Sequence, residues 1–271
     1  MTDSWRQPRR LLLAAIGGLT VFFLVAPTLV VIPLSITSGH SLSWPPTGFS
    51  LQWYEKMITD PQWSTGFVNS GKVAVLTAIT ATVLGTLAAL GIVRGRFVGK
   101  SLVNGLILSP LIVPVIIVSI GMFAFYVSFN KNLGVPFTGT LHGLVLAHTA
   151  LALPYVVVNV STSLRTIDRT LELAAMNLGA NPMRTFLRIT LPIILPGMFA
   201  GGLFAFITSW DEVVVSIFLT TARFRTLPVE MWEQVRQVVD PTVAAVSTTL
   251  LAVTTTLLLL IFVVRRQAPA R

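Results

Sequence analysis

The strongest constraint on this chain is a series of six apolar runs, each long enough to cross a lipid bilayer as a helix. An α-helix needs about 20 mostly apolar residues to span the hydrocarbon core. Of the 271 residues, 54% are hydrophobic and 11% are charged, whereas soluble domains carry about a quarter charged residues. The predicted spans are 11–34, 67–93, 102–127, 141–164, 193–219 and 243–264. We therefore predict an all-α, six-span membrane protein with a single transmembrane domain over residues 1–271.

The first run is interpreted as a retained span. Arg6, Arg9 and Arg10 precede it, as basic residues precede the apolar part of a signal peptide. That apolar part is only about 7–15 residues long in signal peptides, whereas this run has 24 residues and no small-residue cleavage site follows it.

The distribution of basic residues predicts the orientation in the membrane. Counting the N-terminus as the first gap, the odd-numbered gaps contain thirteen lysines and arginines and the even-numbered gaps contain five, with Lys72 inside a span. Because positively charged loops stay on the cytoplasmic side, both termini and residues 165–192 are predicted to be cytoplasmic. The net charge of +9 is then a topology signal, and we expect no nucleic-acid partner.

Several classes of chemistry are excluded by missing motifs. The chain has no cysteine, no GxxxxGK[ST] phosphate-binding loop and no HExxH zinc motif. We therefore predict that it is not an enzyme, that it uses no cofactor, and that any ATP chemistry belongs to a separate chain. His142 and His148 lie on the fourth span without a second ligand at metal spacing, so we interpret them as packing or interfacial residues and expect no metal site.

The cytoplasmic segment 165–192 is too long for an unstructured connection between two helices. Asp168 is suited to cap the start of a helix, and Gly179 is suited to the positive φ at a helix end. Asn181 followed by Pro182 predicts the start of a second helix. The segment is therefore predicted to contain two short helices.

One face of the first short helix carries small and apolar side chains. The residues that repeat there at helical spacing are Leu171, Ala174, Ala175 and Leu178. Small side chains beside Gly179 let another backbone approach closely, and Arg184 and Arg188 lie one turn apart on the second helix. Such a pair of helices suits docking into a groove of a partner protein. The alternative is a solvated loop with a charged face.

The stretch "ELAAMNLG", which begins at Glu172, resembles the cytoplasmic EAA loop of ABC-importer permeases. In that family the loop inserts into a cleft of the ATPase subunit. The stretches "LGANPMRTFLRITLPIILPG", "SWDEVVVSIF" and "TLPVEMWEQVR" resemble the spermidine/putrescine branch. The family's glutamate directly precedes the alanines, whereas Leu173 occupies that position here. The resemblance implies ATPase docking through Glu172, Ala174, Ala175, Gly179 and Arg184.

The same resemblance implies a fold, a location and a set of partners. The fold is that of type I importers, called MetI-like, in the inner membrane of a bacterium. The expected partners are a second homologous permease subunit, two cytoplasmic ATPase subunits, an extracytoplasmic substrate-binding protein and the lipid bilayer. Transport would proceed by alternating access, driven by ATP hydrolysis on the ATPase chains.

Two adjacent acids, Asp211 and Glu212, lie in the predicted fifth span. A carboxylate at bilayer depth is costly against lipid and normally faces a cavity or a charged partner. We predict that one of them lines the substrate pathway, and the alternative is a structural ion pair, for instance with Lys72. Aromatic rings also attract cations. The aromatic candidates for the pathway are Trp210, Phe206 and Tyr155.

The substrate expected from the resemblance is a polyamine or a related small organic cation. A permease for a different substrate is the first alternative, because the wider family also carries iron, anions and sugars. A proton- or sodium-coupled secondary transporter, with Asp211 and Glu212 as coupling sites, is the second. The chain shows no obvious inverted repeat of the kind common in such transporters.

Overall fold

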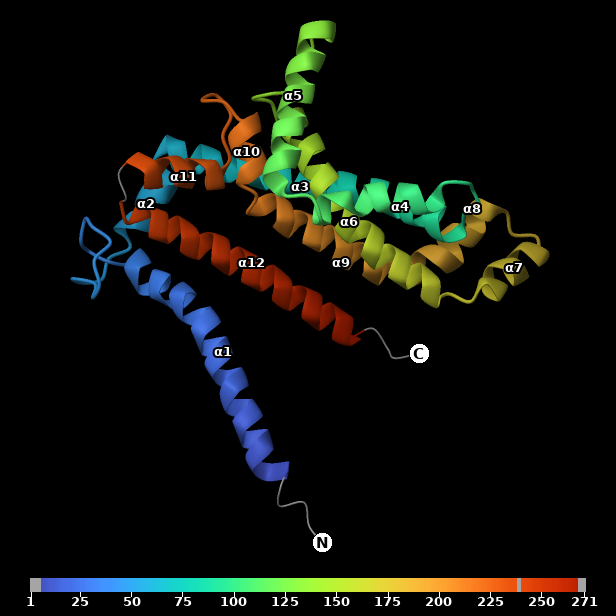
Figure 1. The fold of residues 1–271 in the computed structure, drawn as a ribbon, viewed down its shortest axis with the longest axis horizontal. Helices are drawn as coiled ribbons and strands as arrows, with labels where there is room; N and C mark the ends of the chain where they lie inside the picture. The colour runs from blue at the N-terminus through green and yellow to red at the C-terminus, as the bar shows by residue number, and fades with distance from the viewer. Residues whose placement is uncertain (1–5, 238–239, 268–271) are drawn as a thin grey trace. The chain divides into compact units, whose positions relative to one another are not determined.

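The computed structural model describes residues 6–237 and 240–267, so Arg271, one of the basic residues used for the orientation, lies outside the described residues. The described chain is helical, and its only β-structure consists of two isolated bridges. The elements are α1 (Arg6–Ser35), α2 (Gln52–Thr59), α3 (Pro61–Arg94), α4 (Lys100–Leu108), η1 (Ser109–Leu111), α5 (Val115–Leu133), α6 (Leu141–Thr166), α7 (Arg169–Asn177), α8 (Pro182–Thr185), η2 (Phe186–Thr190), α9 (Leu191–Trp210), α10 (Val214–Leu219), α11 (Leu227–Gln237) and α12 (Thr242–Gln267) (Figure 1).

Six stretches of helix among the described residues are long and apolar enough to cross a membrane. They are Leu11–Ser35, Pro61–Arg94, Val115–Leu133, Leu141–Thr166, Pro182–Trp210 and Thr242–Leu260. This confirms the all-α class and the number of predicted spans. The third and fifth spans have different bounds from those that the sequence predicted.

The third predicted span, 102–127, does not form one helix. The apolar run is divided into α4, the 3₁₀ turn η1 and α5, and the helix long enough to cross a membrane begins only at Val115. Pro114 precedes that helix with an extended ψ of 127°. Proline disfavours helical backbone in the residue before it and cannot donate a helical hydrogen bond, so the two prolines of "SPLIVP" interrupt an otherwise continuous apolar run.

The fifth predicted span, 193–219, is also interrupted. Helix α9 ends at Trp210, and the short helix α10 begins at Val214. At its other end, α9 continues from α8 through the π-helical turn η2. Asp211 and Glu212 therefore lie in a break between two helices, and the expected additional turns of continuous helix after Asp211 are absent.

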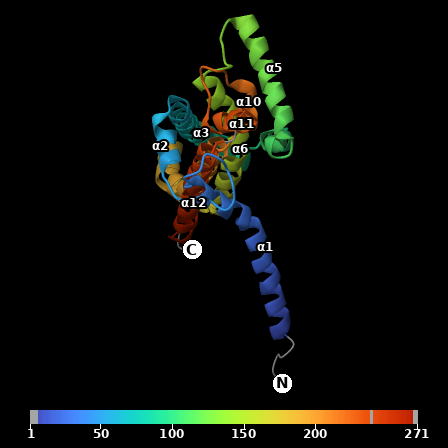
Figure 2. The ribbon, with the colours of Figure 1, turned by 90° about the vertical axis from the view of Figure 1, so that its left-hand side faces the viewer.

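The described chain packs as two compact units, and the single transmembrane domain stays a prediction. The larger unit contains Pro61–Trp232 and the described residues from Ala252 onwards, and its centre is formed by α3, α6 and α9, which pack along one another (Figures 1 and 2). Val156 of α6 is fully buried in this core. A Cβ at Gly201 of α9 would lie 2.8 Å from the Cα of Val156, and a Cβ at Gly85 of α3 would lie 2.7 Å from its Cβ. These glycines allow the close helix approach on which packing in lipid depends.

Helix α5 leaves this core at a steep angle (Figures 1 and 2). It packs against α10 and, through Tyr126, against α6, and it carries exposed apolar side chains such as Ile117 and Phe125. In a bilayer, these side chains suit contact with lipid or with another membrane chain.

The smaller unit contains the residues up to Asp60 together with Glu233–Leu251. Within it, the indole N–H of Trp53 donates a hydrogen bond of 2.8 Å to the carbonyl of Thr37. The ammonium of Lys56 lies 2.6 Å from a carboxylate oxygen of Asp240. Burial alone would raise the pKa of Asp240, but its hydrogen bonds with Lys56 and Thr242 outweigh this effect and lower the pKa.

Candidate functional site

The segment 165–192 forms the two short helices that the sequence predicted, α7 and α8. The carboxylate of Asp168 accepts a hydrogen bond of 2.9 Å from the backbone N–H of Thr170 and caps α7. Hydrogen bonding to the backbone and side chain of Thr170 lowers the pKa of Asp168. Gly179 has a φ of +88°, and the side-chain oxygen of Asn181 accepts from the N–H of Arg184 at 2.8 Å, with Pro182 in the first turn of α8.

The outer face of this segment is exposed and largely apolar. Leu171, Ala174 and Leu178 lie on one face of α7 at positions three and seven residues apart, and all three are exposed. Other exposed apolar side chains of the segment are Leu173, Met176, Met183 and Leu187. Arg184 and Arg188 are exposed as well. An apolar patch with basic flanks, outside the predicted spans, has the composition of a protein-docking surface.

Two of the predicted docking residues are less accessible than expected. Ala175 is half-buried, although it lies beside the exposed Ala174. Glu172 turns towards the body of the chain, where its carboxylate oxygen Oε1 lies 2.9 Å from the guanidinium of Arg94 and accepts a 2.9 Å hydrogen bond from the hydroxyl of Thr190. The docking roles of Ala174, Gly179 and Arg184 fit their exposure, and the docking role of Glu172 stays a prediction.

The break between α9 and α10 lies at the opposite end of α9 from the α7–α8 segment (Figure 1). Glu212 lies in this break and stabilises it. Its two carboxylate oxygens accept hydrogen bonds of 3.0 Å from the backbone N–H groups of Val215 and Ser216, in the first turn of α10. Its carboxylate also lies 3.7 Å from the imidazole of His148. Glu212 therefore makes its contacts within the chain, with the first turn of α10 and with His148. The alternative of an ion pair with Lys72 stays a hypothesis.

His148 connects three helices through a buried polar network. One ring nitrogen lies 2.8 Å from the hydroxyl of Ser209 on α9, and the other lies 3.1 Å from the hydroxyl of Ser216 on α10. The side chain of His148 is 1% exposed. Such networks are worth most when every buried polar group has a partner, so this network fixes α10 against α6 and α9. His148 therefore has a packing role, as expected, and it fulfils this role through contacts with Ser209 and Ser216.

Asp211 differs from its neighbour because its side chain is exposed. Its backbone N–H closes the last turn of α9 on the carbonyl of Ile207, at 3.3 Å. Of the two adjacent acids, Asp211 is thus the one that is accessible to a substrate or to a partner chain.

The three predicted aromatic residues belong to two different ring pairs. Phe206 and Trp210 are stacked, with centroids 5.8 Å apart and an interplanar angle of 17°. Trp210 is 3% exposed, and Phe67 of α3 meets its ring edge-on at 5.5 Å. Tyr155 instead stacks on Phe204, at 6.2 Å. The structure therefore brings Phe206 and Trp210 together beside Asp211 and gives Tyr155 a different neighbour.

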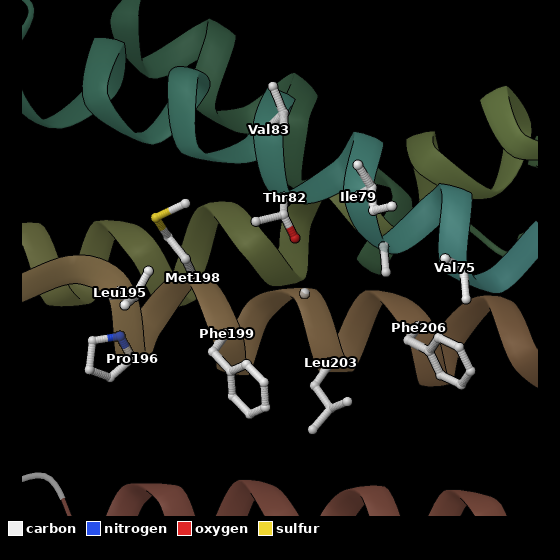
Figure 3. Close-up of a pocket in the computed structure, with 12 residues that line it drawn as sticks. Val75, Ile79, Thr82, Val83, Leu195, Pro196, Met198, Phe199, Leu203 and Phe206 are labelled. Carbon is white, nitrogen blue, oxygen red and sulfur yellow. The ribbon is translucent and has the colours of Figure 1, made fainter. Parts of the chain in front are cut away.

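Phe206 also lines an apolar groove of about 800 Å³ between α3 and α9 (Figure 3). Val75, Ile79 and Val83 come from α3, and Leu195, Phe199 and Leu203 come from α9. Thr82 points from α3 towards α9, where a Cβ at Gly202 would lie 2.6 Å from its hydroxyl oxygen (Figure 3). Sequence reasoning did not identify this groove, because it depends on how α3 and α9 pack.

Comparisons with known proteins agree with this architecture. Putrescine transport system permease protein PotI of Escherichia coli is 34% identical over 245 residues, which cover 90% of this chain and 85% of that protein. Spermidine/putrescine transport system permease protein PotC of Haemophilus influenzae is 31% identical over 227 residues, covering 83% of this chain and 85% of the relative. A chain of the crystal structure of a bacterial alginate ABC transporter, in complex with an alginate pentasaccharide-bound periplasmic protein, is 16% identical with a TM-score of 0.71, and the match covers 98% of this chain and 97% of that one.

The family described as binding-protein-dependent transport system inner membrane component matches residues 81–270. Together with the six apolar helices, this match identifies a multi-pass inner-membrane protein with the fold of ABC-importer permeases. The chain belongs to the family of inner membrane components of binding-protein-dependent transport systems.

Proposed function

We propose that this chain is the translocation subunit of an ATP-driven importer of polyamines such as putrescine and spermidine. The family supports the importer, and the substrate class is supported by the names of the two relatives. The chain itself has no phosphate-binding loop motif, so ATP hydrolysis is assigned to a separate subunit. An ion-coupled secondary transporter has no support in these relatives.

The chemistry around Asp211 supports a cationic substrate. Its exposed carboxylate directly follows the stacked pair of Phe206 and Trp210. A polyamine is a flexible chain of ammonium groups separated by methylenes, which matches a carboxylate next to aromatic and apolar surface. Phe206 lines the groove between α3 and α9 and stacks on Trp210, the residue that directly precedes Asp211. Tyr155 and Glu212 remain predicted pathway residues without such a connection.

The outer face of α7 and α8 supports docking of an ATPase subunit. Leu171, Ala174 and Leu178 form its apolar part, and Arg184 adds positive charge. The assembly proposed on this basis contains a second homologous permease chain, two ATPase subunits, and a binding protein that delivers substrate on the outer side.

The proposed orientation has both termini and the α7–α8 segment in the cytoplasm. Because the chain has no cysteine, single cysteines at exposed positions report sidedness without further engineering. Cysteines replacing Arg223 or Gln237 should react with a membrane-impermeant thiol reagent in intact cells. Cysteines replacing Arg96 or Met183 should react only after the membrane is opened. The opposite labelling pattern would reverse the orientation and remove the docking role of the α7–α8 segment.

Uptake by the purified complex tests the substrate class. Proteoliposomes containing the complete complex, with binding protein outside and ATP inside, should accumulate labelled putrescine or spermidine without any ion gradient. Other linear diamines should compete, whereas molybdate and sugars should not. ATP-dependent uptake of an anion or a sugar, with no competition by amines, would exclude the polyamine assignment and leave the importer assignment intact. Uptake that needs a proton or sodium gradient but no ATP would exclude both.

A further inference from the structure

Glu172 joins three elements of the chain at one carboxylate oxygen. It lies on α7, and its Oε1 contacts Arg94, the last residue of α3, and Thr190, the last residue of η2 before α9 begins. Both contacts are 2.9 Å long. The side chains are 23% exposed for Arg94 and 14% for Glu172. Solvent screens such a partly buried pair less than it screens a surface ion pair.

The surroundings of this triad are loosely packed. A cavity of about 200 Å³ lies beside it, lined by Leu90 of α3, Met176 of α7 and Phe186 of η2, among others. The Nε of Arg94 and the hydroxyl of Thr185 are buried there without a hydrogen-bond partner among the described residues. Beside this cavity, the contact of Glu172 with Arg94 gives α7 a direct polar link to the end of α3.

The third element of the triad is a π-helical turn, which is a rare conformation. The turn covers Phe186–Thr190, in the helical segment that leads from α8 into α9. π-turns carry one extra residue per turn and occur often at functional positions, where a helix changes register or direction. The hydroxyl of Thr190 ties the last residue of this turn to Glu172.

We propose that Glu172 is a positioning residue that transmits displacement of α7 to α3 and α9 together. This inference rests on the proposed function, in which an ATPase subunit moves the α7–α8 segment. The two helices connected through Glu172 are also the two that line the apolar groove (Figure 3). The two contacts act at different points, Arg94 at the end of α3 and Thr190 directly before α9. We therefore expect a displacement of α7 to shift these two points unequally and to change the separation of α3 and α9 at the groove, with Glu172 acting within the chain rather than on the ATPase.

The first test uses variants in the complete complex, with uptake per ATP hydrolysed as the readout. Glu172→Gln keeps the shape and an acceptor oxygen but removes the charge that pairs with Arg94. It should leave ATPase co-purification unchanged and lower uptake per ATP about tenfold, the size expected when a charged hydrogen bond is lost. Thr190→Val, which removes only the hydroxyl, should lower the ratio in the same direction. Glu55→Gln, at an exposed acid on α2, is the matched control and should change neither quantity.

Exchanging the two charges separates transmission from simple loss of a side chain. Arg94→Glu and Glu172→Arg alone should each lower the uptake per ATP hydrolysed. The double variant, which restores the opposite charges, should recover a large part of this uptake per ATP. Failure of the double variant to recover would overturn the proposal. If the Glu172→Gln complex is recovered in low yield, uptake per ATP hydrolysed is compared for the double variant and Thr190→Val only.

A distance measurement tests the mechanical part directly. Spin labels on cysteines replacing Val83 of α3 and Leu195 of α9, both exposed at the groove, should report different distances with and without ATP in the otherwise unchanged complex. In Glu172→Gln the distance should no longer respond to ATP.

An unchanged response with normal uptake would refute the transmission role and leave the importer function standing. Loss of the ATPase from Glu172→Gln would mean that Glu172 contacts the ATPase, which also refutes it. If the unsubstituted complex binds no ATPase, the proposed function itself fails.

Discussion

Replacing Ala174 with tryptophan is expected to weaken ATPase binding strongly while leaving the chain inserted in the membrane. Ala174 is exposed on α7 between Leu171 and Leu178, so a larger side chain meets no obstacle within the chain but occupies the space of a docked partner. Loss of a central contact in an interface costs about 2 kcal/mol or more, which weakens binding about 30-fold. Co-purification of the ATPase subunit from detergent extracts measures the effect.

The matched control for this variant is Val98→Trp. Val98 is fully exposed and lies after α3, outside the α7–α8 segment. It should tolerate tryptophan with normal ATPase recovery. If Ala174→Trp also recovered a normal amount of ATPase, docking through this face of α7 would be wrong.

The turn at Gly179 gives an independent test of the same surface. A Cβ at Gly179 would meet no atom within 4 Å, but the φ of +88° strains any other residue, by about 1–2 kcal/mol. Gly179→Val should therefore reorient α7 against α8 and weaken ATPase binding. Gly99 has a φ of +84° and equally open space, so Gly99→Val carries the same backbone strain away from the docking face. A difference between the two variants isolates the role of the turn.

The helix caps of the docking segment could be predicted because their chemistry is local. Asp168, Gly179 and Asn181 each act on backbone groups within four residues, and this spacing is readable from the sequence alone. The contact of Glu172 with Arg94 joins residues 78 positions apart. No local pattern specifies such a pair, so the inward orientation of Glu172 was not predicted.

The helix breaks inside the third and fifth predicted spans have a common physical reason. Average hydropathy records how apolar a run is, and it does not record where the backbone stops being helical. In the third span, Pro110 lies in the 3₁₀ turn and Pro114 directly precedes α5, and average hydropathy does not register either effect. In the fifth span, the break at Asp211 is stabilised by Glu212 and by His148, which lies on another helix. A polar network between distant helices carries no signal in the hydropathy of either helix.

The groove between α3 and α9 could not be predicted from the sequence, because it also depends on contacts between distant helices. Its lining residues are ordinary apolar residues of two spans, and nothing in their pattern distinguishes them from residues that face lipid. Phe206 was predicted to be a pathway residue because aromatic rings attract cations. Its place in the groove supports that hypothesis by a separate observation.

Neutralising Asp211 and Glu212 separately is expected to give two different defects. Asp211→Asn keeps the shape of an exposed side chain and removes its charge, so the complex should assemble with unchanged thermal stability. If a substrate ammonium group meets this carboxylate, uptake of putrescine should fall about tenfold or more, because a charge-assisted hydrogen bond is lost. Labelled uptake into proteoliposomes measures the effect, with the exposed Glu55→Gln as control.

Glu212→Gln should act mainly on stability. The carboxylate accepts from two backbone N–H groups of α10 with its two oxygens, whereas an amide offers a single oxygen acceptor. One buried N–H is then left without its partner, which costs about 1–3 kcal/mol. The complex should therefore unfold at a lower temperature than the Asp211→Asn complex, and its uptake should fall in proportion to the amount of folded complex. Full putrescine uptake by Asp211→Asn would show that the Asp211 carboxylate does not bind the substrate. A stable Glu212→Gln complex with no uptake would show that Glu212 has this role instead.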